Sequence, residues 1–334
     1  MPHRPFTRRA ICAVAGLAAV ALVATGCGGG NSSSGGGGGD SQASGSKTQT
    51  VRVGTLPIAN AAPMYLGIQK GFFKDEGLDV KSTVLQTGND IITGMVSGDY
   101  DVGFVGYISA GIAAAKGVPI CVATASDATG TSPEDDWQVL VAGANSPIKA
   151  PQDLAGKTIS VNGLGGVAEV MIKAAMDKAG ADWKSVKMIE VPFPDVPAAI
   201  AAGRIDAGYT SEPFVTTVLD QGGKVVFAPQ SYLAPDYPNG SYAASKKIIG
   251  SDPDLMKNFD AAMTKSLDYA QAHPDEVRAI IPTYTKIPAE LANRMRLPVF
   301  QSALDPKAIN EQMGFLKKYG LVDKAPTAKS LICS

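Results

Sequence analysis

The turn over residues 162–168 has the glycine spacing in this chain that comes closest to a cofactor motif. Gly163, Gly165 and Ala168 fit the pattern Gly-x-Gly-x-x-Ala between an expected strand and an expected helix, and Glu190 ends the next strand. These positions meet a dinucleotide fingerprint, in which glycines let backbone N–H groups approach a phosphate at a helix start. The alternating strands and helices around this turn span only about a hundred residues, however, which is small for a dinucleotide-binding domain. Residues 1–26 also have the layout of an export signal, and an exported chain has little access to nicotinamide cofactors. We therefore expect no cofactor, and we expect the turn to bind a polar or anionic group.

Residue types that perform acid–base, nucleophilic or metal chemistry are sparse elsewhere. After the export signal, His273 is the only histidine, and it precedes Pro274 at an expected helix end, where a solvated capping role is the simpler interpretation. The sequence has no Gly-x-Ser-x-Gly elbow, phosphate P-loop or metal-spaced His/Cys cluster. A nucleophile would therefore lack its usual base. We expect a binding protein that is not an enzyme and that has no metal site.

Polar and small residues gather instead in the loops that follow expected strands. In open α/β sheets, ligands bind outside the carboxyl ends of the strands, where helix starts expose backbone donors. Each loop alone could be ordinary turn chemistry, Asp195 could be a helix cap, and the aromatic members could be core residues. The candidate ligand-binding residues are Asn60, Tyr65, Gln86, Thr87, Gly88, Asn89, Tyr107, Gly165, Gly166, Val167, Phe193, Asp195, Ser211 and Glu212.

A duplicated pattern indicates that two similar units carry these loops. Gly-x-x-Asp-x-Gly-aromatic occurs at residues 98–104 and again at residues 203–209. In each copy a helix-like stretch precedes the first glycine, which is typical of a helix C-terminus. The repeat places Tyr107 and Glu212 at equivalent positions. We expect these two unlike residues to face one ligand cleft between the units.

Strands alternate with helices in both units, which predicts an α/β fold. We expect two lobes, each a mostly parallel sheet flanked by helices, hinged by two crossovers. Residues 51–140 and 241–334 are expected to form the first lobe, and residues 141–240 the second. Apolar residues spaced by three or four over residues 255–270 indicate that a helical region completes the first lobe.

The N-terminal segment carries export and tethering signals. A basic start and an apolar run that ends in small residues before Cys27 are typical of a bacterial lipoprotein signal peptide over residues 1–26. We expect Cys27 to be lipidated and residues 27–50 to form a Gly/Ser linker to the membrane anchor. A plain signal peptide is the alternative. The pair Arg8-Arg9 leaves Sec and twin-arginine export both open.

Two cysteines remain beyond the lipid site and the signal. Cys121 and Cys333 could pair in a disulfide or stay separate thiols, with Cys121 buried in a strand. The whole chain has a net charge of −1, from 30 basic and 31 acidic residues. It lacks the basic stripe that nucleic-acid binding requires. We expect a monomer whose partners are a small solute and membrane proteins.

Residues 62–80, with Lys70-Gly71-Phe72-Phe73 at their centre, resemble the first helix and second strand of a family of substrate-binding proteins. The family binds aliphatic sulfonates, taurine, nitrate and thiamine-pyrimidine precursors. Residues 98–103, 153–159 and 211–214 follow in the family's order, so that the resemblance covers about residues 51–319. It implies a two-lobed periplasmic-binding-protein fold of type II.

The resemblance also implies capture of a small solute by lobe closure and its delivery to the permease of an ABC transporter on the outer face of the cell membrane. The helix starts at Gly88-Asn89 and Gly165-Gly166-Val167 would hold an anion, whereas Glu212 would favour an amine-bearing ring. An enzyme on the same fold and a sensor that presents its solute to a membrane receptor are the alternatives. Pyrimidine-forming relatives carry a Cys-rich segment and an essential histidine, and neither is seen here.

Overall fold

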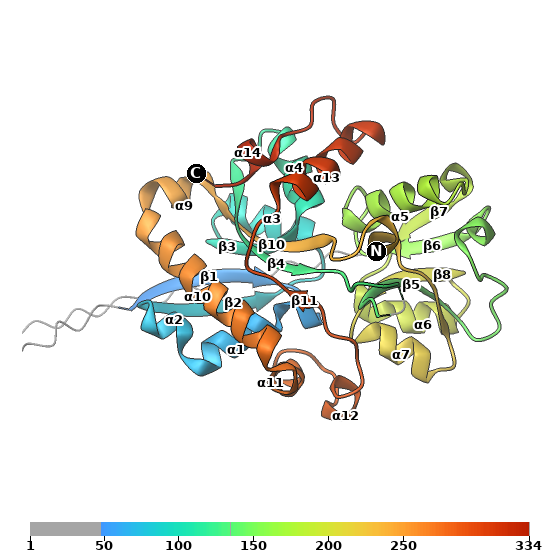
Figure 1. Cartoon of the computed structure of the whole chain (residues 1–334), viewed down its shortest axis with the longest axis horizontal. Helices are drawn as coiled ribbons and strands as arrows, with labels where there is room; N and C mark the ends of the chain where they lie inside the picture. Colours follow the sequence, from blue (N-terminus) through green and yellow to red (C-terminus); the bar gives the residue numbers. More distant parts are fainter. Residues whose placement is uncertain (1–47, 134, 334) are drawn as a thin grey trace, which may run out of the picture. The chain divides into compact units, whose positions relative to one another are not determined.

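The computed structural model describes residues 48–133 and 135–333, and residues 46–334 group as one compact unit. The expected signal peptide, Cys27 and most of the linker lie outside the described residues. Within the described part, two β-sheets carry helices on their faces (Figure 1). None of its helices is both long and apolar enough to cross a bilayer.

Sheet A belongs to the first lobe and has the strand order β11-β4-β10-β3-β1-β2. β1 pairs in parallel with β2 and β3, whereas β10 lies antiparallel between β3 and β4. Val51 and Val53 of β1 are buried and Arg52 between them is exposed, as the two-residue period of a strand requires. The strands are β1 (Gln49–Thr55), β2 (Leu78–Val84), β3 (Val102–Gly106), β4 (Ile120–Ala128), β10 (Pro238–Ser245) and β11 (Val299–Phe300).

Sheet B belongs to the second lobe and has the strand order β7-β6-β8-β5-β9. β6 pairs in parallel with β7 and β8, and β5 lies antiparallel between β8 and β9. The strands are β5 (Gln138–Ala142), β6 (Thr158–Val161), β7 (Lys187–Glu190), β8 (Ala207–Ser211) and β9 (Lys224–Phe227).

The two sheets flanked by helices confirm the expected two-lobed α/β fold, and each sheet receives one reversed strand from a crossover. β5 is the first strand after the chain leaves sheet A, and β10 is the first strand after it leaves sheet B. Because both insert antiparallel, the pairing in each sheet is mixed, while β1 to β4 share one direction and β6 to β9 share one direction. The lobe boundaries expected after residues 140 and 240 also fall inside these strands, since β5 lies wholly in sheet B and β10 wholly in sheet A.

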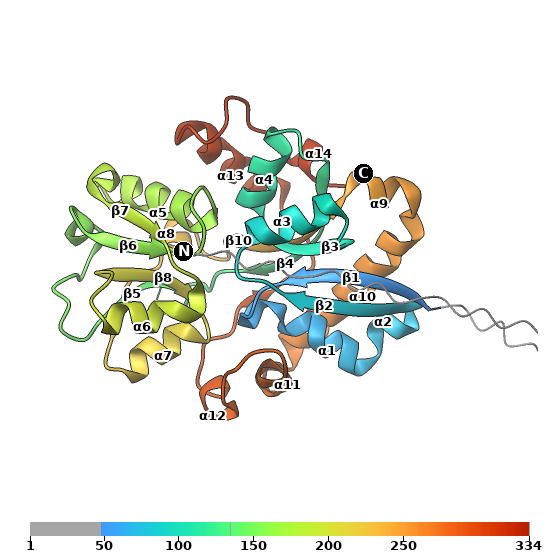
Figure 2. The ribbon, with the colours of Figure 1, turned by 180° about the vertical axis from the view of Figure 1, so that it is seen from behind.

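Helices cover both faces of each sheet. α1, α2 and α10 pack together on one face of sheet A, and α3 and α4 lie on the other (Figure 2). In the second lobe, α5 and α8 pack together, as do α6 and α7. The helices are α1 (Ala62–Lys70), α2 (Phe72–Asp75), α3 (Gly88–Ser97), α4 (Tyr107–Ala115), α5 (Val167–Lys178), α6 (Val196–Ala201), α7 (Phe214–Asp220), α8 (Pro229–Leu233), α9 (Lys246–Ser251), α10 (Pro253–Ala272), α11 (Pro274–Ile280), α12 (Ala289–Ala292), α13 (Pro306–Lys318) and α14 (Ala328–Leu331).

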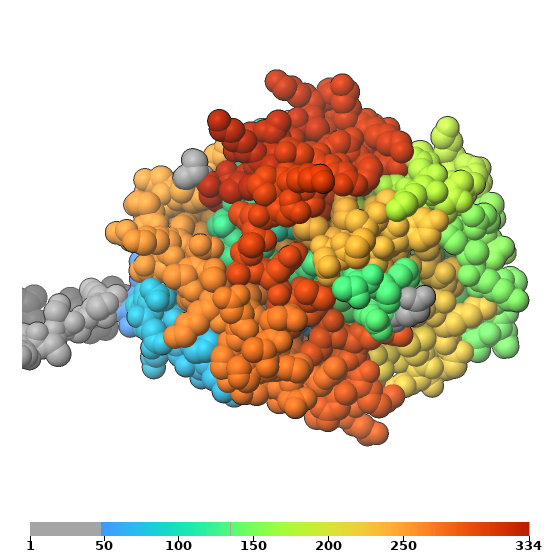
Figure 3. Space-filling model, in the orientation of Figure 1, coloured from blue at the N-terminus to red at the C-terminus, as the bar shows by residue number. Residues whose placement is uncertain are grey.

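The chain end is fixed to β4. Of the two alternatives for the cysteines, the structure has the Cys121–Cys333 disulfide. The Cys333 N–H also donates to the Val122 carbonyl at 2.8 Å. The expected helical region, α9 to α14, spreads over one face of the molecule (Figure 3) and completes the first lobe. His273 ends α10, where it stacks on Tyr269 and is exposed.

Contacts from this C-terminal region also reach the second lobe. Arg294 pairs with Asp220 of α7 at 2.7 Å, and Lys318 pairs with Asp177 of α5 at 2.7 Å. Both pairs are largely exposed, so that each contributes little to stability. They connect the C-terminal region to the second lobe at the surface of the molecule.

Candidate functional site

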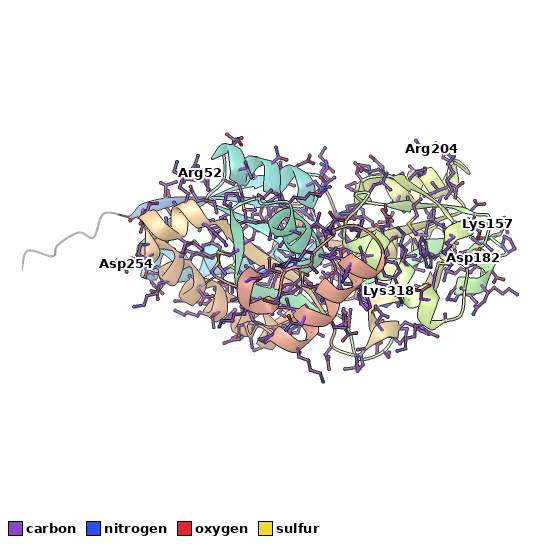
Figure 4. All side chains as sticks on the ribbon, turned by 90° about the horizontal axis from the view of Figure 1, so that it is seen from above. Arg52, Lys157, Asp182, Arg204, Asp254 and Lys318 are labelled. Carbon is purple, nitrogen blue, oxygen red and sulfur yellow. A yellow bond between two sulfur atoms is a disulfide. The ribbon has the colours of Figure 1, made fainter. Side chains whose placement is uncertain are left out.

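A cavity lies where the loops of sheet A meet those of sheet B. It encloses about 50 Å³, several times the 10–15 Å³ or so that one water needs. Its lining contains no Asp, Glu, Lys, Arg or His, and charged side chains such as Arg52 and Arg204 project from the periphery instead (Figure 4). The lining residues are Leu56, Ile58, Thr87, Gly88, Asn89, Phe104, Val105, Gly106, Ser109, Gln138, Asn162, Gly163, Gly166, Val167, Ala168, Phe193, Tyr209 and Asn239.

Three helices begin at this cavity. Thr87 is the N-cap of α3, and its hydroxyl accepts from the Asp90 N–H at 3.1 Å. α4 follows Gly106 and α5 follows Gly166, and neither glycine can supply a side-chain cap. The first N–H groups of a helix have no partner within it, and they carry partial positive charge. The cavity wall is therefore rich in donors although it contains no cation.

Gly106 lets the two lobes approach closely. A Cβ atom at this position would lie 2.3 Å from Cγ2 of Val167, which belongs to the second lobe. Gly106 itself has φ −74° and ψ 151°, a conformation that any residue adopts. The glycine is therefore required by the space between the lobes and not by the backbone.

A buried chain of hydrogen bonds leads from the cavity into the crossover region. The Tyr209 hydroxyl donates to Oε1 of Gln230, and Gln230 Nε2 donates to Oδ1 of Asn239 at 2.7 Å. Asn239 Nδ2 then donates to Oδ1 of Asp127 at 2.9 Å. A second amide, that of Asn60, donates to the same Asp127 oxygen at 2.7 Å. We call these four hydrogen-bonded residues, Tyr209, Gln230, Asn239 and Asp127, the crossover relay. Their hydrogen bonds join β8 and α8 of the second lobe to β10 and β4 of the first.

Two carboxyl groups in this region are buried. Burial raises the pKa of Asp127 to about 6, although the hydrogen bond from Asn239 lowers it. Burial also raises the pKa of Asp136 to about 6, although the hydrogen bond from the Trp137 N–H lowers it. Oδ1 of Asp136 accepts from the Trp137 N–H at 2.9 Å, directly before β5. Both acids therefore lie at the crossovers, outside the cavity lining.

These pKa values predict how stability depends on pH. An unfolded Asp has a pKa near 3.9, so the folded protein binds protons between about pH 4 and pH 6 that the unfolded chain does not bind. The free energy of unfolding should therefore rise as the pH falls from 7.5 to 5.5, by about 1 kcal/mol for each carboxyl. Urea denaturation at several pH values measures this. Asp136→Asn should remove about half of the increase in the free energy of unfolding. If this free energy does not change with pH in the wild type, the prediction is contradicted.

Comparison with known proteins agrees with this architecture. Residues 58–277 match the family described as NMT1/THI5 like. The chain belongs to the NMT1/THI5-like family. A formylaminopyrimidine-binding protein from Halalkalibacterium halodurans is 26% identical over 242 residues, which are 71% of this chain and 70% of that protein. The taurine-binding periplasmic protein of Escherichia coli is 26% identical over 205 residues, 61% of each chain.

A solved structure shares the fold of this NMT1/THI5-like protein. The alkanesulfonate-binding protein SsuA from Xanthomonas axonopodis pv. citri, bound to MOPS, superposes with a TM-score of 0.69. The match covers 85% of this chain and 96% of that one at 16% sequence identity. At this identity the likeness shows the two-lobed fold and nothing about the ligand.

The cavity brings together six of the residues that the sequence of this NMT1/THI5-like protein predicts for ligand binding. They are Thr87, Gly88, Asn89, Gly166, Val167 and Phe193. Gly165 lies beside them, with φ +68°, and its N–H donates to Glu169. Glu190, the acidic member of the dinucleotide-like pattern, accepts from the Leu164 N–H at 3.3 Å. The glycine-rich turn therefore meets the cavity at the start of α5.

Glu212 and Tyr107 do not face each other across the cavity. Neither is among its lining residues, and both are buried. The Glu212 carboxylate accepts from the N–H and the hydroxyl of Thr216, at 3.0 and 2.9 Å, and from the Arg296 N–H at 3.1 Å. Burial raises the pKa of Glu212 and that of Tyr107. Glu212 thus connects the start of α7 to the chain near Arg296, and it is not among the residues that line the cavity.

The remaining predicted residues have other surroundings. Tyr65 stacks on Tyr284 with the ring centres 4.0 Å apart, and Asn60 bonds to Asp127. The Ser211 hydroxyl donates to the Glu212 carbonyl at 3.3 Å. Gln86 and Asp195 line a separate groove that both lobes also form. None of these five residues lines the cavity.

Sequence reasoning missed the cavity residues that come from strands and strand ends. Gln138 lies in β5 and Asn239 in β10, and both line the cavity although they are almost fully buried. Oε1 of Gln138 has no hydrogen-bond partner in the described part of the chain. The available signal at Gln138 was a carboxamide directly before the apolar run of residues 139–142, because a buried amide requires a partner.

Proposed function

We propose that this protein is the solute-binding component of an ABC importer and that it holds one small solute in the cavity between its lobes. The observation that carries the proposal is the cavity itself, which both lobes line and on which three helix starts converge. Membership of the family and the binding proteins among the named relatives support it. We infer binding without turnover, followed by delivery to a membrane permease.

The lining favours a solute that presents hydrogen-bond acceptors. The starts of α3, α4 and α5 offer backbone donors with partial positive charge, which suit sulfonate, nitrate or carbonyl oxygens. Phe104, Phe193 and Tyr209 add aromatic surface that could pack against an apolar or ring portion. Because the Glu212 carboxylate is engaged elsewhere, the cavity has no negative group to attract an amine. Sulfonate- and nitrate-like solutes and neutral pyrimidine precursors therefore fit better than cations, and a taurine-like zwitterion would fit through its sulfonate.

We also propose that the protein works outside the cell membrane. A relative named as periplasmic supports export. The small residues before Cys27 support a lipid anchor, and the Gly/Ser segment after it would give the folded part freedom to reach a permease. Radiolabelled palmitate incorporated into the wild type and lost in Cys27→Ser would establish the anchor.

A panel of four solutes tests the proposed function: ethanesulfonate, taurine, nitrate and a formylaminopyrimidine. At a hundredfold excess over its Kd, a bound solute should stabilise the protein by about 2.7 kcal/mol, measured as a rise in thermal midpoint. Tetramethylammonium serves as the matched control, since helix starts disfavour cations. If none of the four solutes raises the midpoint above the control, solute binding in this cavity is contradicted.

A further inference from the structure

We propose that Asp127 is a positioning residue for the solute site, because it holds the Asn239 carboxamide in one orientation at the cavity wall. The inference rests on the proposed function, solute binding in this cavity. Asp127 lies at the end of β4 and has no exposed surface, and it is not a lining residue. Its influence on a solute would therefore pass through Asn239, which does line the cavity.

The hydrogen bonds of the crossover relay are all donated in the same direction along the chain of residues. Each donor points toward Asp127, from the Tyr209 hydroxyl through Gln230 to Asn239. The two ends of a carboxamide have nearly the same shape, so that its orientation is set by which neighbour accepts and which donates. An ionised carboxylate can only accept, and therefore it requires the Nδ2 end of Asn239 to face it.

The second amide makes this arrangement rigid. Asn60 donates to the same oxygen of Asp127 as Asn239 does, at 2.7 Å and 2.9 Å. Two donors on one oxygen hold the carboxylate in place, and charge strengthens both bonds. The relay uses one N–H and one lone pair of the Asn239 amide. The other N–H and the other lone pair stay available to a solute in the cavity. Because the amide orientation is fixed, the positions of this donor and this acceptor are fixed too.

The ionisation of Asp127 is the condition for this orientation. Its pKa is raised to about 6 by burial. The phenols of Tyr107 in α4, Tyr209 in β8 and Tyr242 in β10 interact with its charge, and burial raises the pKa of each, so that all three stay neutral below pH 8. Asp136 acts on Tyr209 and titrates in the same range as Asp127. Protonation gives Asp127 an O–H donor, which removes the requirement for Nδ2 of Asn239 to face it.

The first experiment measures affinity against pH. Each panel solute that binds is titrated by calorimetry between pH 5 and pH 8. Affinity of the wild type should fall about tenfold from pH 7.5 to pH 5, the cost of roughly one directed hydrogen bond. Asp127→Asn should bind about tenfold more weakly at pH 7.5 and show little further change with pH. Asp136→Asn is the matched control and should keep the wild-type pH profile.

Two further measurements separate positioning from a structural role. In an Asn239→Ala background, Asp127→Asn should cause no additional loss of affinity, because the two residues act as one unit. Asn239→Ala alone should also lose the pH dependence, which keeps the test valid if Asp127→Asn does not fold. Additive losses, or an unchanged pH profile in Asn239→Ala, would overturn the inference.

A measurement on the protein without solute distinguishes this inference from the proposed function. The side-chain amide signals of Asn239, recorded by ¹⁵N NMR, should shift with an apparent pKa near 6 in the wild type and stay constant in Asp127→Asn. Constant signals in the wild type would overturn the inference whatever binds. Failure of all four solutes to bind would instead contradict the proposed function.

Discussion

Replacing both Cys121 and Cys333 with alanine should lower the free energy of unfolding by about 2–5 kcal/mol. The disulfide joins residues 212 positions apart, and a bridge that closes a long loop removes much conformational freedom from the unfolded chain. In the folded state it fixes the end of the C-terminal region to β4, where Cys333 also bonds to the backbone of Val122. Urea denaturation would measure the loss as a lower midpoint.

Reduction supplies the control for the disulfide prediction. Wild-type protein treated with dithiothreitol should unfold at nearly the same urea concentration as the double variant. The variant should also keep its solute affinity, because the bridge lies within the first lobe and away from the cavity lining. An unchanged midpoint after both treatments would mean that the bridge contributes nothing to stability.

Gly106→Val should weaken solute binding by about 100-fold while it leaves each lobe folded. The added side chain would meet Val167 across the cavity, where even a Cβ atom has only 2.3 Å. Since the backbone at Gly106 accepts any residue, the strain falls on closure of the lobes and not on β3 or α4. Calorimetric titration of the panel solutes would measure the loss, and circular dichroism would check the fold.

A compensating change makes the Gly106 prediction specific. Val167→Ala removes the two methyl groups that the new side chain would strike, so that the double variant should regain much of the affinity. Gly314→Ala serves as the matched control, because a Cβ atom there meets nothing within 4 Å. Wild-type affinity in Gly106→Val would show that the lobes need not approach as closely as they do here.

The parts of the site that depend on local chain chemistry could be predicted from the sequence. Glycines and capping residues after expected strands identified the starts of α3 and α5, and the cavity is lined there by Thr87, Gly88, Asn89, Gly166 and Val167. These signals are local, because a helix start is encoded within a few residues of itself. The alternation of strands and helices similarly indicated two α/β lobes.

The parts that depend on distant partners could not be predicted. The internal repeat gave Tyr107 and Glu212 equivalent positions. The Glu212 carboxylate, however, accepts a hydrogen bond from the backbone N–H of Arg296, 84 residues further along the chain. Gln138 and Asn239 lie in the two reversed crossover strands, which look like ordinary strands in the sequence. Their place at the cavity follows from the insertion of those strands between neighbours, and single-sequence patterns do not specify strand order.

The reversed strand β10 also sets an order for the assembly of the chain. Sheet B is built from one continuous stretch, residues 138–227, whereas the middle of sheet A needs β10, residues 238–245. During synthesis the N-terminal residues emerge first. The second lobe can therefore be completed while β3 and β4 still lack β10, the strand that joins them. The first lobe closes later, and the disulfide at Cys333 can form only after residues 246–333 have followed β10.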